Sequence, residues 1–407
     1  MEQKESHKTY WIINQYCGSR IHGMNFRSWY FANELKKKGH APYIITGAFS
    51  HLLQKLPEVK GLFTYEEVEG VPYTWVKLRK YKGSQSIGRI LGMIEFMIKL
   101  FFFPKKSLPK PDVILVSSLS PFPVLNAYFW SKRYNAKLLF EVRDIWPLTL
   151  IEIGGMSKNH PLSLFFGWFE KFAYKKADKV ISLLPKANEH MVSRGMDPSK
   201  FVCIPNGFNP EDMDLQENLD DSYFQDIPKD KFIVGYAGSL GLANAMDYLL
   251  ESAKLLESKE NIHFVIVGKG QHKERLIKKS GANVTFLDPV QKNEVQSVLK
   301  RFDLCYIGWH DQKIYRFGIS PNKIFDYSFA AKPILHSVSA GNDLVQEAKS
   351  GLSVAPENAE LIKETIEKLA SMSADELAEM GKRGKEYIIT HHTFSALCDK
   401  LIKSVEE

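Results

Sequence analysis

Short runs of apolar residues alternate along the first half of the chain with longer segments whose apolar residues recur every three or four positions. The longer segments predict helices over 24–38, 122–134 and 161–176. The apolar runs predict strands over 10–16, 41–46, 72–78, 112–118, 137–142, 178–183 and 201–204. Because these runs are continuously apolar, we expect strands that are buried on both faces, as in a parallel sheet covered by helices.

The second half repeats this alternation. Its predicted strands lie in KFIVGYAG, NIHFVIVG, NVTFLD, DLCYIG and KPILHS, and each is followed by a helical pattern. Residues 206–230, between the halves, are acidic, contain Pro and Asn, and follow no clear period, which indicates a linker. Near the end, Ser373 and Glu376 have the spacing of a capping box and predict the start of a helix.

These patterns predict an α/β protein built from two Rossmann-like parallel-sheet domains. The domains are expected at 1–205 and 231–385, with the linker between them and a final helix over 386–407 that could return to the first domain. Ligands of such sheets bind beyond the carboxyl ends of the strands. Two domains in tandem could therefore present these ends to each other across a cleft.

The composition excludes several classes of protein. With 407 residues, of which 44% are hydrophobic and 25% charged, each domain can bury its own core, and a disordered chain is excluded. The four cysteines lie far apart without a Cys-x-x-Cys pair, which indicates a reducing compartment and argues against a disulfide scaffold or a zinc site. The charged start MEQKESHKTY is unlike a signal peptide, and no uncharged apolar stretch reaches the ~18 residues of a membrane span.

The charge is distributed unevenly along the chain. Residues 1–200 carry 30 Lys and Arg against 16 Asp and Glu, a net charge of +14, whereas residues 201–407 carry 24 against 31, a net charge of −7. A basic half that faces nucleic acid or a membrane surface is one interpretation. Unevenly placed surface lysines are the other.

One segment of the basic half favours the interpretation that this half faces a membrane surface. Residues 87–103, IGRILGMIEFMIKLFFF, show a narrow polar stripe and a wide apolar face, but are too short and too charged to span a bilayer. Apolar insertion beside basic residues is typical of peripheral binding to anionic membranes, whereas no nucleic-acid motif is found. A core helix is the alternative, and it is favoured for the similar segment 161–176. The candidate membrane-facing residues are Arg89, Lys99, Phe101, Phe102, Phe103, Lys105 and Lys106.

Three glycine-bearing turns follow predicted strands and are candidates for phosphate binding. They are QYCGSRIHGMN with Gly18, YAGSLG with Gly238 and Gly241, and IVGKG with Gly268. Glycine lets a ligand approach the backbone, and a following helix offers free N–H groups. Any one of them could be a tight turn only. None completes G-x-G-x-x-G, which argues against a nicotinamide dinucleotide.

A further segment, YRFGISPNKIFDYSFAAKPILHS, carries charged residues around a Pro-containing turn. Lys323 could neutralise a diphosphate with Arg316, and Asp326, one helical turn beyond Lys323, could accept hydrogen bonds from ribose hydroxyls. The alternative is a set of solvated charges or a Lys–Asp helix pair worth a few tenths of a kcal/mol.

Taken together, the first glycine loop with its helix ending in KKKGH, EVRDIWP, IPNG, YAGSLG, IVGKG and PNKIFDYSFAAKPI resemble the retaining glycosyltransferases of family four, which have the GT-B fold. EVRDIWP and SPNKIFDY look most like bacterial O-antigen and capsule transferases, some of which use N-acetylfucosamine-type donors. The resemblance implies a nucleotide-sugar donor in the C-terminal domain. It also implies an undecaprenyl-diphosphate-linked acceptor in the N-terminal domain, at the cytoplasmic face of the membrane.

The chain departs from the family at the donor diphosphate. Many members have an Arg and a Lys where this chain has Ser239 and about Asn244, and the two family glutamates correspond to Gly318 and Asp326. We therefore expect Lys323 and Arg316, with the Gly238–Gly241 backbone and Ser239, to bind the diphosphate. Base recognition is expected near the turn that ends at Val290, and ribose contacts are expected at Asp326 and Gly268.

Arg143 and Asp144 directly follow the predicted strand KLLFEV, where α/β proteins place functional groups. Asp144 could contact sugar hydroxyls or take the acceptor proton, and the alternative is a local ion pair with Arg143. The D-x-D at Asp212 and Asp214 lies in the linker, so no metal and no cofactor are expected. The competing functions are a GT-B nucleotide-sugar 2-epimerase and a non-catalytic relative that only binds ligands.

Overall fold

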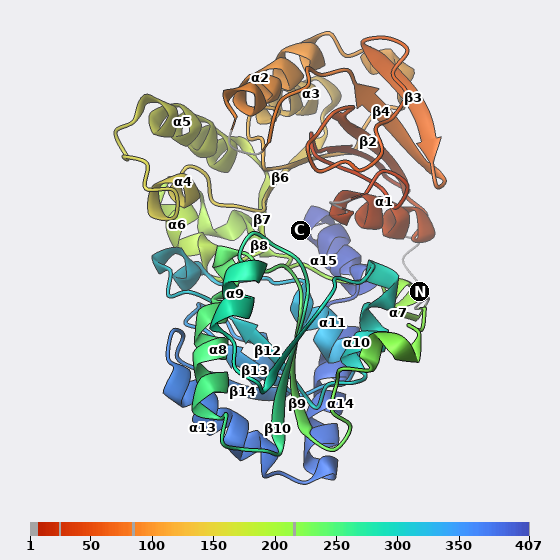
Figure 1. Ribbon diagram of the computed structural model, residues 1–407. Helices are drawn as coiled ribbons and strands as arrows, with labels where there is room; N and C mark the ends of the chain where they lie inside the picture. Colours follow the sequence, from red (N-terminus) through yellow and green to blue (C-terminus); the bar gives the residue numbers. More distant parts are fainter. Residues whose placement is uncertain (1–6, 24–25, 84–85, 215–216, 407) are drawn as a thin grey trace, which may run out of the picture. The chain divides into compact units, whose positions relative to one another are not determined.

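The computed structural model describes residues 7–23, 26–83, 86–214 and 217–406, and the chain divides into two compact units (Figure 1). The N-terminal unit comprises residues 1–205 and 394–407, and the C-terminal unit comprises residues 206–393. The first six residues of the charged start, and the first two of the helix predicted over 24–38, lie outside the described residues.

An eight-stranded sheet with the order β3-β4-β2-β1-β5-β6-β7-β8 forms the centre of the N-terminal unit. Neighbouring strands are parallel except β3 and β4, which form an antiparallel pair. The elements are β1 (Thr9–Ile13), α1 (Arg27–Lys37), β2 (Ala41–Gly47), β3 (Phe63–Val68), β4 (Val71–Val76), α2 (Ile87–Phe101), η1 (Lys105–Ser107), β5 (Val113–Ser117), α3 (Val124–Tyr134), β6 (Lys137–Val142), α4 (Leu148–Glu152), α5 (Pro161–Lys176), β7 (Lys179–Ser182), α6 (Ala187–Ser193), η2 (Pro198–Lys200), β8 (Phe201–Cys203) and α15 (Phe394–Glu406).

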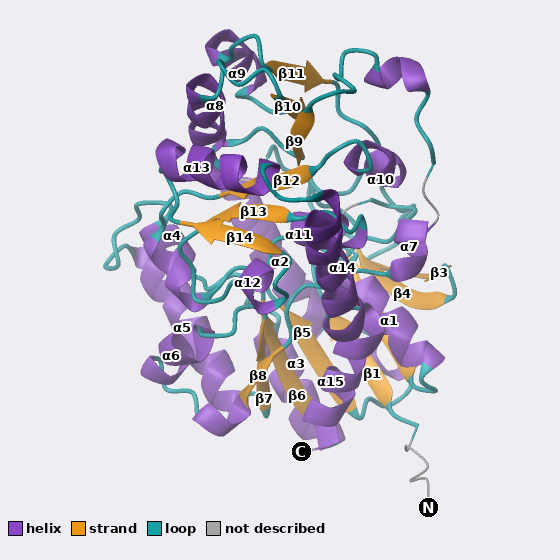
Figure 2. Ribbon diagram, turned by 90° about the horizontal axis from the view of Figure 1, so that it is seen from below, coloured by secondary structure: helices purple, strands orange, loops and turns teal. Residues whose placement is uncertain are grey.

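The C-terminal unit contains a six-stranded parallel sheet with the order β11-β10-β9-β12-β13-β14. Figure 2 shows its strands in orange and the surrounding helices in purple. The elements are α7 (Pro210–Asp214), η3 (Asp221–Phe224), β9 (Phe232–Ala237), η4 (Leu242–Asn244), α8 (Met246–Leu255), β10 (Ile262–Val267), α9 (Lys273–Lys279), β11 (Val284–Leu287), η5 (Lys292–Glu294), α10 (Val295–Leu299), β12 (Leu304–Gly308), η6 (Lys313–Phe317), α11 (Lys323–Phe329), β13 (Ile334–Ser337), α12 (Leu344–Glu347), β14 (Gly351–Val354), α13 (Ala359–Ala370) and α14 (Ala374–His391).

Alternate strand residues of the C-terminal sheet pack against helices on its two faces. Val234 and Phe264 contact the cluster that contains α8 and α13, whereas Ile233 and Val265 contact the cluster that contains α10 and α11. This burial on both faces explains the continuously apolar strand sequences. The predicted capping box is also confirmed, because the Ser373 side chain accepts from the N–H of Glu376 at the start of α14.

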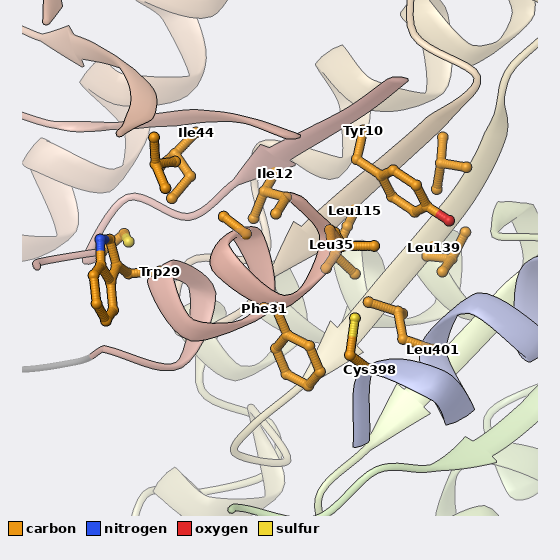
Figure 3. Close-up of a cluster of buried hydrophobic side chains, with 14 of the residues drawn as sticks. Tyr10, Ile12, Trp29, Phe31, Leu35, Ile44, Leu115, Leu139, Cys398 and Leu401 are labelled. Carbon is orange, nitrogen blue, oxygen red and sulfur yellow. The ribbon is translucent and has the colours of Figure 1, made fainter. Parts of the chain in front are cut away.

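The last helix of the chain, α15, packs against the N-terminal unit. Figure 3 shows Leu401 of α15 and Leu35 of α1 beside strand residues that include Ile12, Leu115 and Leu139. Together they bury one face of the eight-stranded sheet. The last helix therefore belongs to the core of the unit in which the chain begins.

The linker prediction is wrong for residues 206–230. This segment belongs to the C-terminal unit, and its apolar residues Phe208, Met213, Phe224 and Ile227 are buried in the core of that unit. They are spaced irregularly because they project from short helices and turns, so the segment shows no helix or strand period.

Strands β3 and β14 lie at sheet edges and were not predicted. Five of the six β3 residues are half-buried or exposed. Glu66 and Glu67 also interrupt the apolar sequence, so β3 shows no continuous apolar run. The turn between β3 and β4 has the geometry of a hairpin. Glu69 and Gly70 both have positive φ, as in a two-residue type I′ turn.

Candidate functional site

The C-terminal sheet has the strand order of a doubly wound nucleotide-binding fold. Strand β9 lies at its centre, and the chain runs outward from β9 in one direction through β10 and β11 and in the other through β12. Ligands of such sheets bind where the strand order reverses, beyond the carboxyl ends of the two central strands. Here this point lies where β9 is followed by the loop Gly238–Gly241 and β12 is followed by Trp309.

Lys323, the first residue of α11, projects across this point. Its Nζ donates to Asn244 Oδ1 at 2.5 Å and lies 5.1 Å from the centroid of the Tyr236 ring. A Cβ atom at Gly238 would come within 2.2 Å of Lys323 Cε, so a larger residue at this position would displace the lysine side chain. Burial lowers the pKa of Lys323 to about 8, although the charge of Asp326 opposes this shift.

The Lys323 ammonium lies where the family pattern places the positive charge of a different residue. The resemblance implies a cation near residue 244, where this chain has asparagine. In the fold, the Lys323 ammonium contacts that asparagine from a different element. The structure therefore restores a positive charge at this loop. Sequence spacing alone does not reveal it, because 79 residues separate the two positions.

The two glycine loops of the C-terminal unit pack against each other. A Cβ atom at Gly268 would lie 1.9 Å from the carbonyl oxygen of Gly238, and one at Gly270 would lie 2.4 Å from that of Leu240. The close approach of two backbones therefore requires these glycines. Gly241 is different, because a Cβ atom there would meet nothing within 4 Å.

Two other residues predicted to bind the donor, Ser239 and Arg316, are both exposed but make different contacts. Ser239 is exposed, and its carbonyl accepts from Tyr236 Oη at 2.6 Å. Arg316 is exposed in η6, donates to the Lys313 carbonyl and packs 4.1 Å from the centroid of the Phe317 ring. Both of these contacts lie within its own turn, so they do not place Arg316 beside Lys323.

Asp326 is a buried carboxylate of α11 and forms an ion pair with Lys292 of η5. Sequence analysis did not single out Lys292, because η5 lies 34 residues away. Val290 is half-buried in the loop after β11 and packs against the core cluster that contains α10 and α11. A ribose ligand of Asp326 would have to share this carboxylate with Lys292 or displace it.

Gly18 belongs to the N-terminal unit. It lies buried in the loop after β1, and its carbonyl accepts from Tyr73 Oη at 2.9 Å. Gly238, Gly241 and Gly268 belong to the C-terminal unit. The predicted phosphate loops are thus distributed over two independent sheets.

Arg143 and Asp144 follow β6 at the carboxyl edge of the N-terminal sheet. The backbone N–H of Arg143 donates to Ser118 Oγ at 3.0 Å, which ties this turn to the loop after β5. The Asp144 side chain is exposed. Surrounding protein nevertheless raises its pKa by disfavouring the charged form, against the opposing charges of Arg143 and Arg89.

The segment 87–103 presents only part of the predicted membrane-facing set to solvent. Phe101, Phe102 and Lys106 are exposed, whereas Lys105 is half-buried beside Trp130. The exposed apolar residues form a stripe along one side of α2 and its end, which we call the α2 stripe: Ile87, Leu91, Ile98, Phe101 and Phe102. Among the residues that the structure describes, no helix is long and apolar enough to cross a membrane.

Three of the predicted membrane-facing residues are corrected. Phe103 is 2% exposed and packs on Trp11 and Trp130 in the core, because the chain turns inward after α2. Lys99 donates to Glu95 at 2.5 Å and to a backbone carbonyl, so the polar stripe of α2 contacts the protein. Arg89 is half-buried and also points toward the protein.

A second apolar surface lies on α5, where a core helix was favoured. Phe166 and Phe169 are buried as expected. Leu164, Phe165 and Trp168 are exposed, and Trp168 is 54% exposed. Helix α5 therefore has a core face and an exposed aromatic face.

Within the described ranges, no group of three or more His, Cys, Asp or Glu side chains is arranged to hold a metal ion.

Two family models match the chain. The model described as Glycosyltransferase Family 4 matches residues 21–212, and the model described as Glycosyl transferases group 1 matches residues 231–372. The first match lies almost entirely in the N-terminal unit and the second lies in the C-terminal unit.

Two curated proteins are similar to this chain over about two thirds of their own length. The putative colanic acid biosynthesis glycosyl transferase WcaI of Escherichia coli (strain K12) is 22% identical over 289 residues, 67% of this chain and 69% of the relative. The alpha-D-kanosaminyltransferase of Streptomyces kanamyceticus is 24% identical over 264 residues, 60% of this chain and 66% of the relative.

Solved structures share the fold at low sequence identity. Sucrose-phosphate synthase of Thermosynechococcus elongatus has a TM-score of 0.69 at 15% identity, with 97% of each chain covered. Anabaena HepE in complex with UDP and glucose has a TM-score of 0.65 at 13% identity, covering 98% of this chain and 100% of that one. A trehalose-6-phosphate structure from E. coli, bound with UDP-2-fluoro glucose, has a TM-score of 0.72 at 12% identity, covering 98% and 99%.

Proposed function

We propose that the chain transfers a sugar from a UDP-linked donor to a lipid-linked saccharide acceptor in the assembly of a bacterial surface polysaccharide. The family matches and the fold support a GT-B glycosyltransferase. The donor proposal is supported by solved neighbours bound to UDP or a UDP-sugar analogue. The polysaccharide proposal is supported by the similarity to the colanic acid transferase. An N-acetylated deoxyhexosamine donor and retention of the anomeric configuration rest on the sequence resemblance.

The observation that carries the donor proposal is the position of Lys323 over Gly238. A cation at the carboxyl end of the central strand can neutralise the diphosphate that leaves when the bond to the sugar breaks. The ammonium is partly desolvated, which strengthens its attraction for an anion. Its hydrogen bond to Asn244 orients it before a ligand arrives.

The proposed reaction makes one bond and breaks one. The bond between the anomeric carbon and the diphosphate oxygen breaks, and the electron pair leaves with UDP. The acceptor hydroxyl oxygen bonds to the same carbon and loses its proton. We assign that proton to Asp144, because burial raises the pKa of this carboxyl and makes its carboxylate a stronger base.

The nucleotide is tested by thermal unfolding with UDP, GDP, dTDP and NAD at equal millimolar concentrations. Because the ligand binds only the folded protein, UDP at about 100 times its Kd should raise stability by about 2.7 kcal/mol, which is a shift of several degrees. We expect UDP to stabilise selectively. A shift with another nucleotide would reassign the donor, and no shift with any of the four would contradict the donor proposal.

We also propose that the α2 stripe binds the cytoplasmic face of an anionic membrane. Ile87 and Phe102 are 76% and 71% exposed, and the exposed Lys106 follows shortly after Phe102 in the chain. Apolar insertion together with nearby basic residues is the usual arrangement for stable peripheral binding.

Co-sedimentation with phosphatidylglycerol vesicles tests this surface. Replacing Ile98 and Phe102 together by Gln removes two exposed apolar side chains and should weaken binding about tenfold or more. The matched control is Leu255→Gln, an exposed leucine of α8 in the other unit, which should bind as the unchanged protein does. Equal binding by the double variant would reject the α2 stripe as the membrane surface.

A further inference from the structure

Arg89 connects α2 to the carboxyl edge of the N-terminal sheet. Its guanidinium carbon lies 5.4 Å from the centroid of the Tyr16 ring and 5.7 Å from that of Trp146, and its Nε donates to Tyr16 Oη at 3.4 Å. Tyr16 lies in the loop after β1, and Trp146 lies in the turn after β6. A residue of the first turn of α2 thus reaches two loops of the edge where ligands of parallel sheets bind.

Several arginine side chains act on the carboxylates at this edge. The carboxylate of Glu141, near the end of β6, forms a buried ion pair with Arg27 at 2.9 Å. Arg143 and Arg89 both act electrostatically on the carboxylate of Asp144. The guanidinium groups of Arg89 and Arg143 therefore act on the same carboxylate, and a concentration of positive charge of this kind favours an anionic ligand.

The same helix turn has an apolar outer side. Ile87 and Leu91, two residues before and two after Arg89, are 76% and 44% exposed. In a helix such neighbours point away from Arg89, since successive residues are about 100° apart. One turn of α2 therefore presents apolar side chains to solvent and a guanidinium to the sheet edge. A ligand that combines a lipid chain with a phosphate group matches both features.

We propose that Arg89 and Arg143 bind the diphosphate of the polyprenyl-linked acceptor while its lipid chain lies along the outer side of α2. This inference rests on the proposed function and names the acceptor subsite within it. Arginine is suited to the role, because its planar guanidinium donates two parallel hydrogen bonds to phosphate oxygens. Cation–π contacts with the Tyr16 and Trp146 rings help to hold the Arg89 guanidinium at this edge.

The experiment titrates the full chain with farnesyl diphosphate in detergent micelles, and with farnesol and UDP as separate probes, by calorimetry. The unchanged protein should bind farnesyl diphosphate at least tenfold more tightly than farnesol. Arg89→Met should weaken farnesyl diphosphate binding about tenfold or more, as expected for losing charged hydrogen bonds. Its affinity for UDP should not change. Arg89→Lys should retain part of the affinity, which separates loss of charge from loosening of the Trp146 turn.

Lys82→Ala provides the matched control, because Lys82 is an exposed cation in the segment that precedes α2. It should bind farnesyl diphosphate as the unchanged protein does. A similar loss in Lys82→Ala and Arg89→Met would indicate a diffuse charge effect and overturn the proposal.

The remaining outcomes identify other sources of phosphate. If Arg89→Met weakens binding only to phosphatidylglycerol vesicles, Arg89 recognises phospholipid headgroups and the acceptor subsite is rejected. If it weakens only UDP binding, the arginine serves the donor, and the proposal is again rejected. Absence of UDP binding by the unchanged protein would contradict the proposed function, whereas unchanged farnesyl diphosphate binding by Arg89→Met contradicts this inference alone.

Discussion

Lys323→Ala is expected to lower kcat/KM for the nucleotide-sugar donor about 100-fold or more. The lysine places the ammonium at the carboxyl end of β9 and holds it against Asn244 at 2.5 Å. Removing a preorganised charge that stabilises a leaving group has an effect of this size in other enzymes. The binding part of the effect can be measured before the acceptor is identified, as the loss of affinity for UDP in calorimetry.

Two further variants make this prediction specific. Gly238→Ala should reproduce the loss, because the added methyl group would come within 2.2 Å of Lys323 Cε and displace the side chain. Lys278→Ala, an exposed lysine on α9, should bind UDP normally and serves as the charge-matched control. Normal UDP affinity in Lys323→Ala would assign the diphosphate to other groups.

The same lysine gives the donor site a pH dependence. Because burial lowers the pKa of Lys323 to about 8, its charged form is lost as the pH rises through this value. UDP favours the charged form, so the affinity of the unchanged protein should fall between pH 7 and 9. The Lys323→Ala protein should show a flat profile over this range, because the titrating group is absent.

Arg27→Met is expected to destabilise the protein by about 3–5 kcal/mol, because it leaves the Glu141 carboxylate buried without its partner. The two side chains are only 4% and 3% exposed, and their ion pair spans 2.9 Å. Arg27 also donates to the carbonyls of Ile204 and Pro205, where the chain leaves the N-terminal unit. Urea unfolding followed by near-ultraviolet circular dichroism measures the loss.

A double variant separates the unpaired charge from the lost backbone contacts. Arg27→Met with Glu141→Gln removes both charges, and it should recover a substantial part of the lost stability. A double variant as unstable as Arg27→Met would show that the contacts to Ile204 and Pro205 carry the effect. A single variant as stable as the unchanged protein would contradict the prediction.

The parallel sheets could be predicted from the sequence because burial on both faces leaves a local signature. The continuously apolar segments FIVGYA and IHFVIV became β9 and β10, as expected. Edge strands such as β3 lack this signature, because one side of each strand meets solvent. The glycine loops could also be predicted, because each directly follows a buried strand. In the structure, Gly268 allows two backbone segments to pack closely against each other.

The candidate site could be predicted only in part, because its residues converge from distant elements. Lys323 was identified by its motif, but its contact with Asn244 and its passage over Gly238 depend on how α11 packs beside β9. Lys292 was missed because nothing in its own segment indicates the carboxylate that it meets. Arg89 was assigned to the membrane because helix periodicity does not say which side of α2 faces the protein.

The sequence by itself determined the α/β class, most strands, the start of α14 and the segments that carry the candidate chemistry. All of these depend on interactions between residues close in the chain, so local patterns record them. The tertiary structure decided that residues 206–230 belong to the C-terminal core, that Phe103 is buried, and that Arg89 reaches Tyr16 and Trp146. These outcomes depend on packing between segments far apart in the chain, which no local pattern encodes.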